Sequence, residues 1–144
     1  MNLLIIQTAF IGDVVLATPL LQAAREQLGA TYVSAVVRPD AVGVLYNNPA
    51  VDEIIPFDKK GADRGLKGLI RLGSRLREKH FEAALIPHRS LRSAMLALLA
   101  RIPVRVGFDT SSGRWLLTHR VPYQAVHEVE RNLRLLSPLT SAPL

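Results

Sequence analysis

Short apolar segments rich in branched residues recur along the chain, and each is followed by a segment with apolar residues at helical spacing. The first apolar run, Asn2–Gln7, predicts a strand that is buried on both faces. The next segment predicts a helix over Val14–Leu28, because its apolar residues repeat at intervals of three and four and Gly29 follows. Pro19 lies in the first turns of this helix and can kink it.

The same alternation continues to the end of the chain. Further strands are predicted over Thr31–Arg38, Glu53–Phe57, Glu82–Pro87 and Arg105–Phe108. Further helices are predicted over Asp40–Tyr46, Gly65–His80, Leu91–Ala100 and His127–Leu136. Strands that alternate with helices indicate β-α-β units and a parallel sheet covered on both faces. We therefore predict one three-layer α/β domain over residues 1–136, with five or more parallel strands, followed by a linker over residues 137–144 that is rich in proline and serine.

Charge adds to this picture, whereas the overall composition is that of an ordinary globular protein. The net charge is +6 and the chain has no cysteine, which excludes disulfides and thiolate metal sites. Between Lys59 and Lys79 there are eight basic residues and only two acidic ones, Asp63 and Glu78. Such a run is either a solvated helix face or a site for an anionic partner: nucleic acid, a phosphorylated sugar or an acidic membrane surface.

No segment predicts a signal peptide or a membrane span. Met1–Ala17 is apolar, but it lacks a basic start and Asp13 interrupts it. No uncharged apolar run approaches the ~18 residues that a membrane-spanning helix needs. We expect a cytoplasmic protein, either soluble or peripheral on a membrane.

The loop after the first strand is the first place to look for a ligand site, because ligands of open parallel sheets bind beyond the carboxyl ends of the strands. This loop, Thr8–Asp13, holds a single glycine and matches neither the dinucleotide-binding nor the P-loop pattern. Gly12 would let a ligand approach the backbone closely. Asp13 is open to two interpretations: an N-cap of the following helix, or a general base that deprotonates a sugar hydroxyl.

Several short motifs, in the same order along the chain, resemble the heptosyltransferases of lipopolysaccharide core assembly. The strand Asn2–Gln7 followed by Ile11–Leu21 (IGDVVLATPLL) resembles the opening of that family. Leu85–Ala94 (LIPHRSLRSA) and Ile102–Asp109 (IPVRVGFD) are similar to its fourth and fifth strands and their continuations. The segment that begins at His127 (HEVERNL) is similar to the family's H-x-V-E-R motif.

The resemblance implies a Rossmann-like fold that forms the N-terminal, acceptor-side half of a two-domain GT-B glycosyltransferase. It also implies transfer of heptose from ADP-heptose, with inversion and without a metal or other cofactor, to the Kdo-containing inner core on lipid A. The catalytic aspartate of the family lies in the Ile-Gly-Asp motif, which corresponds to Asp13 here, beside Gly12 on the donor side. The second domain of the family, which holds most contacts to the nucleotide, lies outside these 144 residues, and the isolated chain is expected to expose Phe10 and Ile11 and to self-associate.

The resemblance also gives the basic residues an expected partner, the anionic acceptor. The residues expected to bind it are Lys59, Lys60, Arg64, Lys67, Arg92 and Arg114, together with His88 at the end of the fourth strand. Peripheral contact with the inner membrane surface follows from the lipid-linked acceptor.

The remaining histidines and Trp115 are interpreted as structural. His80, His119 and His127 are expected at the surface or in packing, and no histidine pair has metal-ligand spacing, so no metal site is predicted. Trp115 is expected in the core or at a domain interface. Two alternatives to the transferase remain: a lone Rossmann-like module that binds an anionic ligand without catalysis, and a basic nucleic-acid binder, which the scarcity of aromatic residues disfavours.

Overall fold

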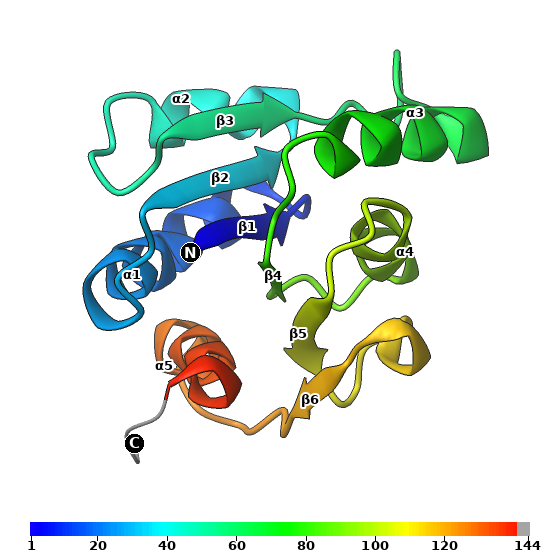
Figure 1. Cartoon of the computed structure of the whole chain (residues 1–144). Helices are drawn as coiled ribbons and strands as arrows, with labels where there is room; N and C mark the ends of the chain where they lie inside the picture. Colours follow the sequence, from blue (N-terminus) through cyan, green and yellow to red (C-terminus); the bar gives the residue numbers. More distant parts are fainter. Residues whose placement is uncertain (141–144) are drawn as a thin grey trace.

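The chain folds into a six-stranded parallel sheet with helices on both faces, and the computed structural model describes residues 1–140 (Figure 1). The strand order is β3-β2-β1-β4-β5-β6, and every neighbouring pair is parallel. The strands are β1 (Asn2–Gln7), β2 (Tyr32–Val37), β3 (Glu53–Pro56), β4 (Ala83–Ile86), β5 (Val104–Phe108) and β6 (His119–Val121). This is the order of the doubly wound dinucleotide-binding fold, which confirms the predicted fold class.

Helices form one layer on each side of the sheet. The α-helices are α1 (Ile11–Gln27), α2 (Val42–Leu45), α3 (Gly65–Arg77), α4 (Leu91–Leu99) and α5 (Glu128–Leu133). The 3₁₀ helices are η1 (Pro39–Ala41), η2 (Arg114–Leu116) and η3 (Arg134–Leu139). In Figure 1, α1 and α5 lie together on one side of the sheet, and α3 and α4 lie together on the other.

Alternation along β1 builds a hydrophobic core on each face. Leu3 and Ile5 pack into the core under α1, α2 and η3, whereas Leu4 and Ile6 pack into the core under α3 and α4. All four side chains are at most 2% exposed. The central positions of a strand buried on both faces must be apolar, and this is why Leu3–Ile6 form an uninterrupted apolar run between Asn2 and Gln7.

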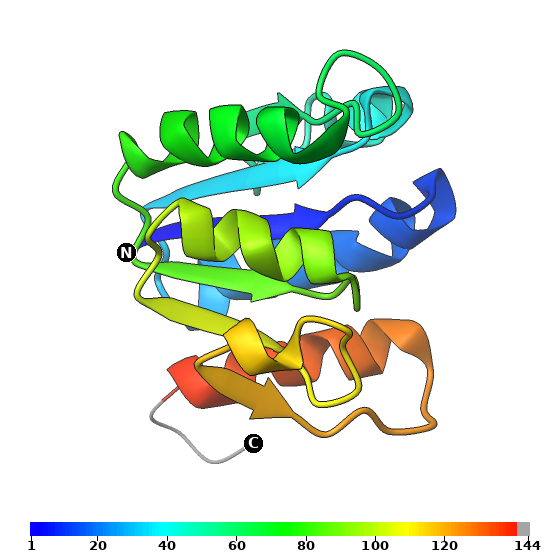
Figure 2. The same cartoon turned by 90° about the vertical axis from the view of Figure 1, so that its right-hand side faces the viewer.

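Helices α3 and α4 approach each other closely at Gly73. A Cβ atom added there would lie 2.7 Å from Leu99 Cβ, nearer than non-bonded carbon atoms come. The backbone of α3 therefore lies directly against α4, and the two helices form one continuous layer (Figure 2).

Most predicted boundaries are confirmed to within a few residues, but three expectations differ from the structure. Helix α1 begins at Ile11 rather than Val14, so its N-cap is Phe10 and the interpretation of Asp13 as the N-cap is wrong. Strand β6 was not predicted, because only Val121 of its three residues is buried. Trp115 does not lie in the core: its side chain is 71% exposed.

The end of the chain is ordered further than predicted. The last helix continues as η3 through Leu139, and Leu135 and Leu136 are buried. The predicted linker thus begins inside a packed turn, and its residues 141–144 lie outside the described part of the chain. Within residues 1–140, no helix is both long and apolar enough to cross a membrane.

Candidate functional site

The strand order reverses between β1 and β4, and a cavity of about 190 Å³ lies beyond the carboxyl ends of these two strands. Its walls come from the end of β1, the start of α1, the segments after β4 and β6, and α5. The lining residues are Gln7, Ala9, Phe10, Asp13, Pro87, His88, Arg89, Phe108, Tyr123, Glu128, Arg131 and Asn132. A reversal point of this kind is where open parallel sheets bind ligands.

Asp13 is half-buried in the first turn of α1 and faces this cavity. Its Oδ2 atom accepts a hydrogen bond from the backbone N–H of Phe10 at 3.0 Å, which fixes the carboxylate against the start of the helix. Its Oδ1 atom makes no hydrogen bond and its carboxylate no ion pair with any residue of the described chain. One oxygen is therefore held in place and the other is available to accept a proton.

His88 is packed between two buried hydroxyl groups. Its Nδ1 atom lies 3.2 Å from Thr8 Oγ1 and 3.5 Å from Ser93 Oγ, and both hydroxyl residues are 2% exposed. Burial lowers the pKa of His88, the charge of Lys59 lowers it further, and the Asp13 carboxylate acts in the opposite direction. His88 is therefore a neutral imidazole at pH 7, under the opposing electrostatic influence of the Lys59 ammonium and the Asp13 carboxylate.

Two arginines stack on Tyr123 at the far wall of the cavity. The guanidinium carbon of Arg89 lies 4.0 Å from the ring centroid, and that of Arg131 lies 4.2 Å from it. Arg131 also donates to the backbone oxygens of Gln124 and Val126 at 3.2 Å, which ties the segment after β6 to α5. Glu128, which also lines the cavity, pairs with Arg131 at 3.8 Å, so this wall carries two cations and one acidic side chain.

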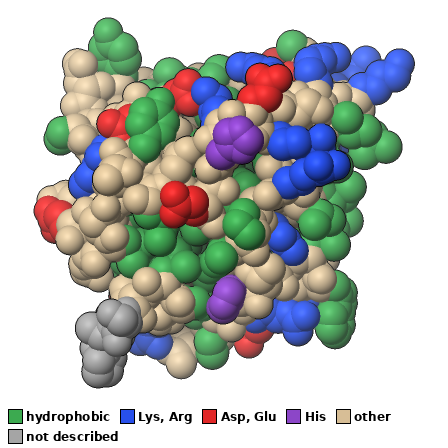
Figure 3. Space-filling model, viewed as in Figure 1, with side chains coloured by type: hydrophobic (Ala, Val, Ile, Leu, Met, Phe, Trp, Pro, Cys, Tyr) green, Lys and Arg blue, Asp and Glu red, His purple; other side chains and the backbone are tan. Residues whose placement is uncertain are grey.

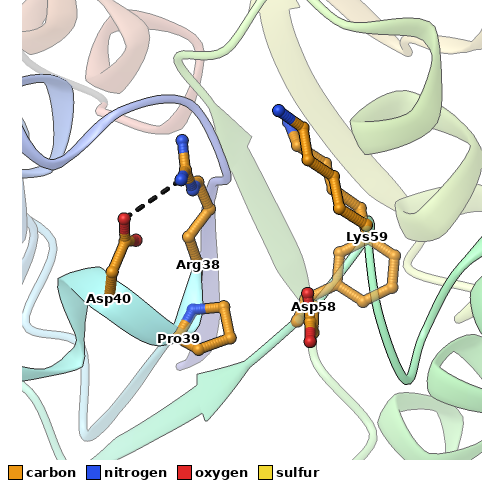
Figure 4. Close-up of a pocket in the computed structure, with 7 residues that line it drawn as sticks. Arg38, Pro39, Asp40, Asp58 and Lys59 are labelled. Carbon is orange, nitrogen blue, oxygen red and sulfur yellow. Dashed lines mark hydrogen bonds and ion pairs between the residues drawn. The ribbon is translucent and has the colours of Figure 1, made fainter.

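A second cavity, of about 230 Å³, lies beyond the carboxyl ends of β2 and β3 (Figure 4). It is lined by Arg38, Pro39, Asp40, Phe57, Asp58, Lys59 and Lys60. Arg38 is paired with Asp40 at 3.0 Å, and in Figure 4 the side chains of Arg38 and Lys59 extend in the same direction from opposite sides of the cavity. Their ammonium and guanidinium groups would face a shared anion.

Lys59 links the two cavities. Its Nζ atom donates to the backbone oxygen of Thr8 at 2.9 Å, in the loop that leads to Asp13. Burial lowers the pKa of Lys59, and the neighbouring charges of Arg38, Lys60 and Arg92 lower it further. Cations that destabilise one another in this way are stabilised when an anion binds among them.

The structure brings some of the predicted site residues together and leaves others apart. Asp13 and His88 share the first cavity, and Lys59 and Lys60 share the second. Gly12 is exposed in the first turn of α1, where an added Cβ would meet nothing within 4 Å. Four of the predicted acceptor residues line neither cavity: Arg64, Lys67, Arg92 and Arg114.

Those four residues lie along α3, α4 and η2. Arg64 is the N-cap residue of α3 and is exposed, as is Lys67 one turn later. Arg92, in the first turn of α4, is near enough to Lys59 to affect its pKa. Arg114 stacks on Trp115, with 5.2 Å between its guanidinium carbon and the ring centroid.

Sequence reasoning missed Arg38, Arg89, Tyr123 and Arg131, all of which line the two cavities. A sequence signal existed for Arg38, which is the last residue of the predicted strand Thr31–Arg38 and so had to lie at the carboxyl edge of the sheet. Tyr123 gave no such signal, because strand β6 was not predicted. Arg131 is the arginine of the H-x-V-E-R motif, but nothing in the sequence showed that it faces this cavity.

The histidines outside the cavities have structural positions, as expected. His127 is the N-cap of α5, and its Nδ1 atom accepts from the backbone N–H of Val129 at 3.2 Å. His80 and His119 are exposed. Among residues 1–140, no group of three or more His, Cys, Asp and Glu side chains is placed to hold a metal ion.

Comparisons with known proteins identify the family to which the chain is similar. The profile of glycosyltransferase family 9 (heptosyltransferase) matches residues 69–144. The lipopolysaccharide core heptosyltransferase OpsX of Haemophilus influenzae is 30% identical over 122 residues, which are 83% of this chain and 34% of that protein.

Solved structures of that family share the fold. The ADP-heptose lipopolysaccharide heptosyltransferase II of Escherichia coli superimposes with a TM-score of 0.78 at 27% identity, over 94% of this chain and 40% of its own. The E. coli heptosyltransferase WaaC, solved with ADP, superimposes with a TM-score of 0.81 at 21% identity, over 99% of this chain and 48% of its own. The chain thus spans less than half the length of these proteins, and its fold matches one half of a GT-B enzyme.

Proposed function

Because the chain belongs to glycosyltransferase family 9, the heptosyltransferases, we propose that it forms the acceptor-side half of an enzyme that transfers heptose from ADP-heptose to the Kdo-containing inner core of lipopolysaccharide. The observation that carries the proposal is the Asp13 carboxylate, which has one oxygen fixed and the other free in a cavity of mixed charge, next to a second, basic cavity. The relatives named above are all heptosyltransferases; OpsX acts on the lipopolysaccharide core, and WaaC was solved with ADP.

In the proposed reaction, Asp13 is the general base of a single, inverting displacement. An acceptor hydroxyl oxygen forms a bond to the anomeric carbon of the donor while the bond from that carbon to the diphosphate breaks. The hydroxyl proton passes to Asp13 Oδ1, and ADP leaves. The hydrogen bond from Phe10 N–H to Oδ2 holds the carboxylate in position throughout.

The cations around Asp13 have separate roles in this proposal. Arg38, Lys59 and Lys60 bind the carboxylates and phosphates of the acceptor, and Arg92 extends this group toward α4. Gly12 leaves space for the donor at the start of α1, where the positive end of the helix favours a diphosphate. No step of the reaction requires a metal ion, because side-chain and backbone groups neutralise the charge.

The test is an assay of the full-length parent protein with a panel of nucleotide sugars and a Kdo-containing acceptor. ADP release should be fastest with ADP-heptose and should require the acceptor. Faster turnover with a hexose donor would show that the transferred sugar is a hexose and not heptose. Tight binding without turnover of any donor would favour the non-catalytic binding module.

A further inference from the structure

Five of the ten large hydrophobic side chains that are exposed in the described chain lie on one layer, formed by α3, α4 and η2. They are Leu66 (60% exposed), Ile70 (46%), Leu91 (49%), Leu98 (42%) and Trp115 (71%). Leu66 and Ile70 are one turn apart on α3, and Leu91 and Leu98 are two turns apart on α4, so each pair points the same way. We call these five residues, with the basic residues around them, the α3–α4–η2 face.

Basic residues surround these apolar side chains, and acidic residues are absent from the three helices. Lys67, Arg71 and Arg75 lie on the exposed side of α3, and Arg92 lies on the exposed side of α4. Lys67, Arg75 and Arg92 form no ion pair with any residue from 1 to 140, and Arg71 has only a long contact of 4.0 Å with Asp63. In Figure 3, Lys, Arg and hydrophobic side chains alternate along the right-hand edge, over α3 and α4.

Trp115 projects from this face between two cations. The guanidinium carbons of Arg114 and Arg120 lie 5.2 Å and 4.8 Å from its ring centroid. Arg120 is also held by a hydrogen bond of 3.0 Å from its Nε to the backbone oxygen of Arg114. An exposed indole beside guanidinium groups matches the headgroup region of a bilayer, where aromatic rings and cations both find favourable partners.

The three helices form a single platform. Figure 2 shows α3, α4 and η2 in the layer nearest the viewer, and α4 contacts both of the others. A groove of about 530 Å³ between the first turns of α3 and α4 adds apolar surface from Leu66, Leu69, Leu91 and Met95. Both helices begin at the carboxyl edge of the sheet, the same edge that carries Asp13 and the two cavities.

We propose that the α3–α4–η2 face docks on the surface of a bilayer that contains anionic phospholipids. Lys67, Arg71, Arg75 and Arg92 meet the headgroup phosphates, while Trp115 and the leucines enter the interfacial region. Docking in this orientation holds the carboxyl edge of the sheet beside the lipid surface, where a lipid-linked acceptor is within reach. The inference depends on this surface and not on the transfer chemistry, so it can fail while the proposed function stands.

Trp115 is the only tryptophan of the chain and reports directly on the docking. Residues 1–144 are mixed with vesicles of phosphatidylcholine alone or of phosphatidylcholine with phosphatidylglycerol, without any nucleotide sugar. With the anionic vesicles, Trp115 emission should shift to shorter wavelength and the chain should co-sediment, and added salt should weaken both effects. Neither effect should occur with phosphatidylcholine alone.

Matched variants separate the contribution of the basic residues to vesicle binding from that of Trp115. The variant Lys67→Gln/Arg75→Gln should lower partitioning to anionic vesicles about fivefold per charge removed, whereas Arg134→Gln, on the opposite side of the sheet, should not change it. In co-sedimentation, Trp115→Ser should lower partitioning by about tenfold or more. The control Tyr46→Ser removes an equally exposed aromatic residue elsewhere (72% exposed) and should leave partitioning unchanged.

Four results would overturn the proposal. One is no spectral shift with anionic vesicles, and a second is equal loss of binding in the control variants. A third is a shift that depends on protein concentration without vesicles, which would identify a second copy of the chain as the occupant. The fourth is an equal shift with an oligonucleotide, which would identify nucleic acid.

Discussion

At the scale of single residues, the loop after β1 serves two purposes. Asp13 stabilises the start of α1 through Oδ2 and keeps Oδ1 free, while Thr8 receives Lys59 on its backbone oxygen and contacts His88 through its hydroxyl. The sequence left Asp13 open to two interpretations, a base or a cap, and only the family resemblance favoured the base. Position alone could not distinguish a base from a cap, because both need a carboxylate at the start of a helix.

The lowered pKa of His88 makes stability depend on pH in a defined direction. As the pH falls through 6.5, the ordinary value, the unfolded chain binds a proton that the folded His88 does not yet take up. The free energy of unfolding should therefore fall in this range. His88→Asn, which retains a hydrogen-bonding group near Nδ1, should flatten the decrease, measured by urea unfolding between pH 7.5 and 5.5. His119→Asn, at an exposed position, is the control and should keep the wild-type slope; equal slopes in all three proteins would refute this account of His88.

The residues that we propose bind the acceptor give a second prediction at the residue scale. Lys60 and Arg64 are exposed and their side chains form no ion pair in the described chain, so charge reversal should leave the fold intact. In the full-length parent, Lys60→Glu/Arg64→Glu should raise the acceptor KM, most strongly at low salt, with little effect on donor binding. Arg101→Glu, beyond the far end of α4, should not change either constant. A fall in donor affinity instead would show that these residues bind the donor and not the acceptor.

At the scale of elements, the apolar pattern was enough to predict ten helices and strands, because each buries a continuous stripe or run. It failed for β6, where His119 and Arg120 are exposed, and at the start of α1, where Phe10, Ile11 and Gly12 are exposed. Exposed positions are not required to be apolar, so the apolar pattern cannot reveal the element to which they belong. Strand β6 is the last strand at one side of the sheet, and α1 begins at its carboxyl edge, so in both places the side chains are not held by the core.

The contact between α3 and α4 gives a prediction for elements. Gly73→Ala should lower the free energy of unfolding by about 1–3 kcal/mol, because the new methyl group meets Leu99 Cβ and the helices must separate. Gly43→Ala, in α2, meets nothing within 4 Å and should be neutral or stabilising by up to about 1 kcal/mol. Chemical denaturation of both variants tests this prediction. An equal change in the free energy of unfolding would show that Gly73 is not needed for the close approach of α3 and α4.

At the scale of the whole molecule, the described residues supply one wall of the proposed ligand site. The cavities at the carboxyl edge hold the Asp13 carboxylate and several cations, and Phe10, Ile11 and Val15 are exposed apolar residues. The sequence predicted the fold and some of the residues at the carboxyl edge of the sheet. It could not predict which basic residues lie close together there. Arg38 and Lys59 are far apart along the chain, and only the pairing of β2 with β3 brings them together.

The chain over residues 1–144 should fold but not catalyse transfer on its own. The positioning of donor against acceptor can supply as much as ~7–11 kcal/mol of barrier reduction, and we propose that a second domain provides much of it. The measurement is ADP release from ADP-heptose with a Kdo-containing acceptor. Turnover well above background would contradict the two-domain mechanism.

The central claim, that Asp13 is the general base, is tested most directly by the kcat of Asp13→Asn in the full-length parent. The asparagine Oδ1 can still accept the hydrogen bond from Phe10 N–H, so the helix start and the fold should persist, with a stability loss of about 1 kcal/mol or less. It cannot accept the proton of the acceptor hydroxyl, so kcat should fall by roughly 10²–10⁴-fold. A folded variant with a near-normal kcat would contradict the account.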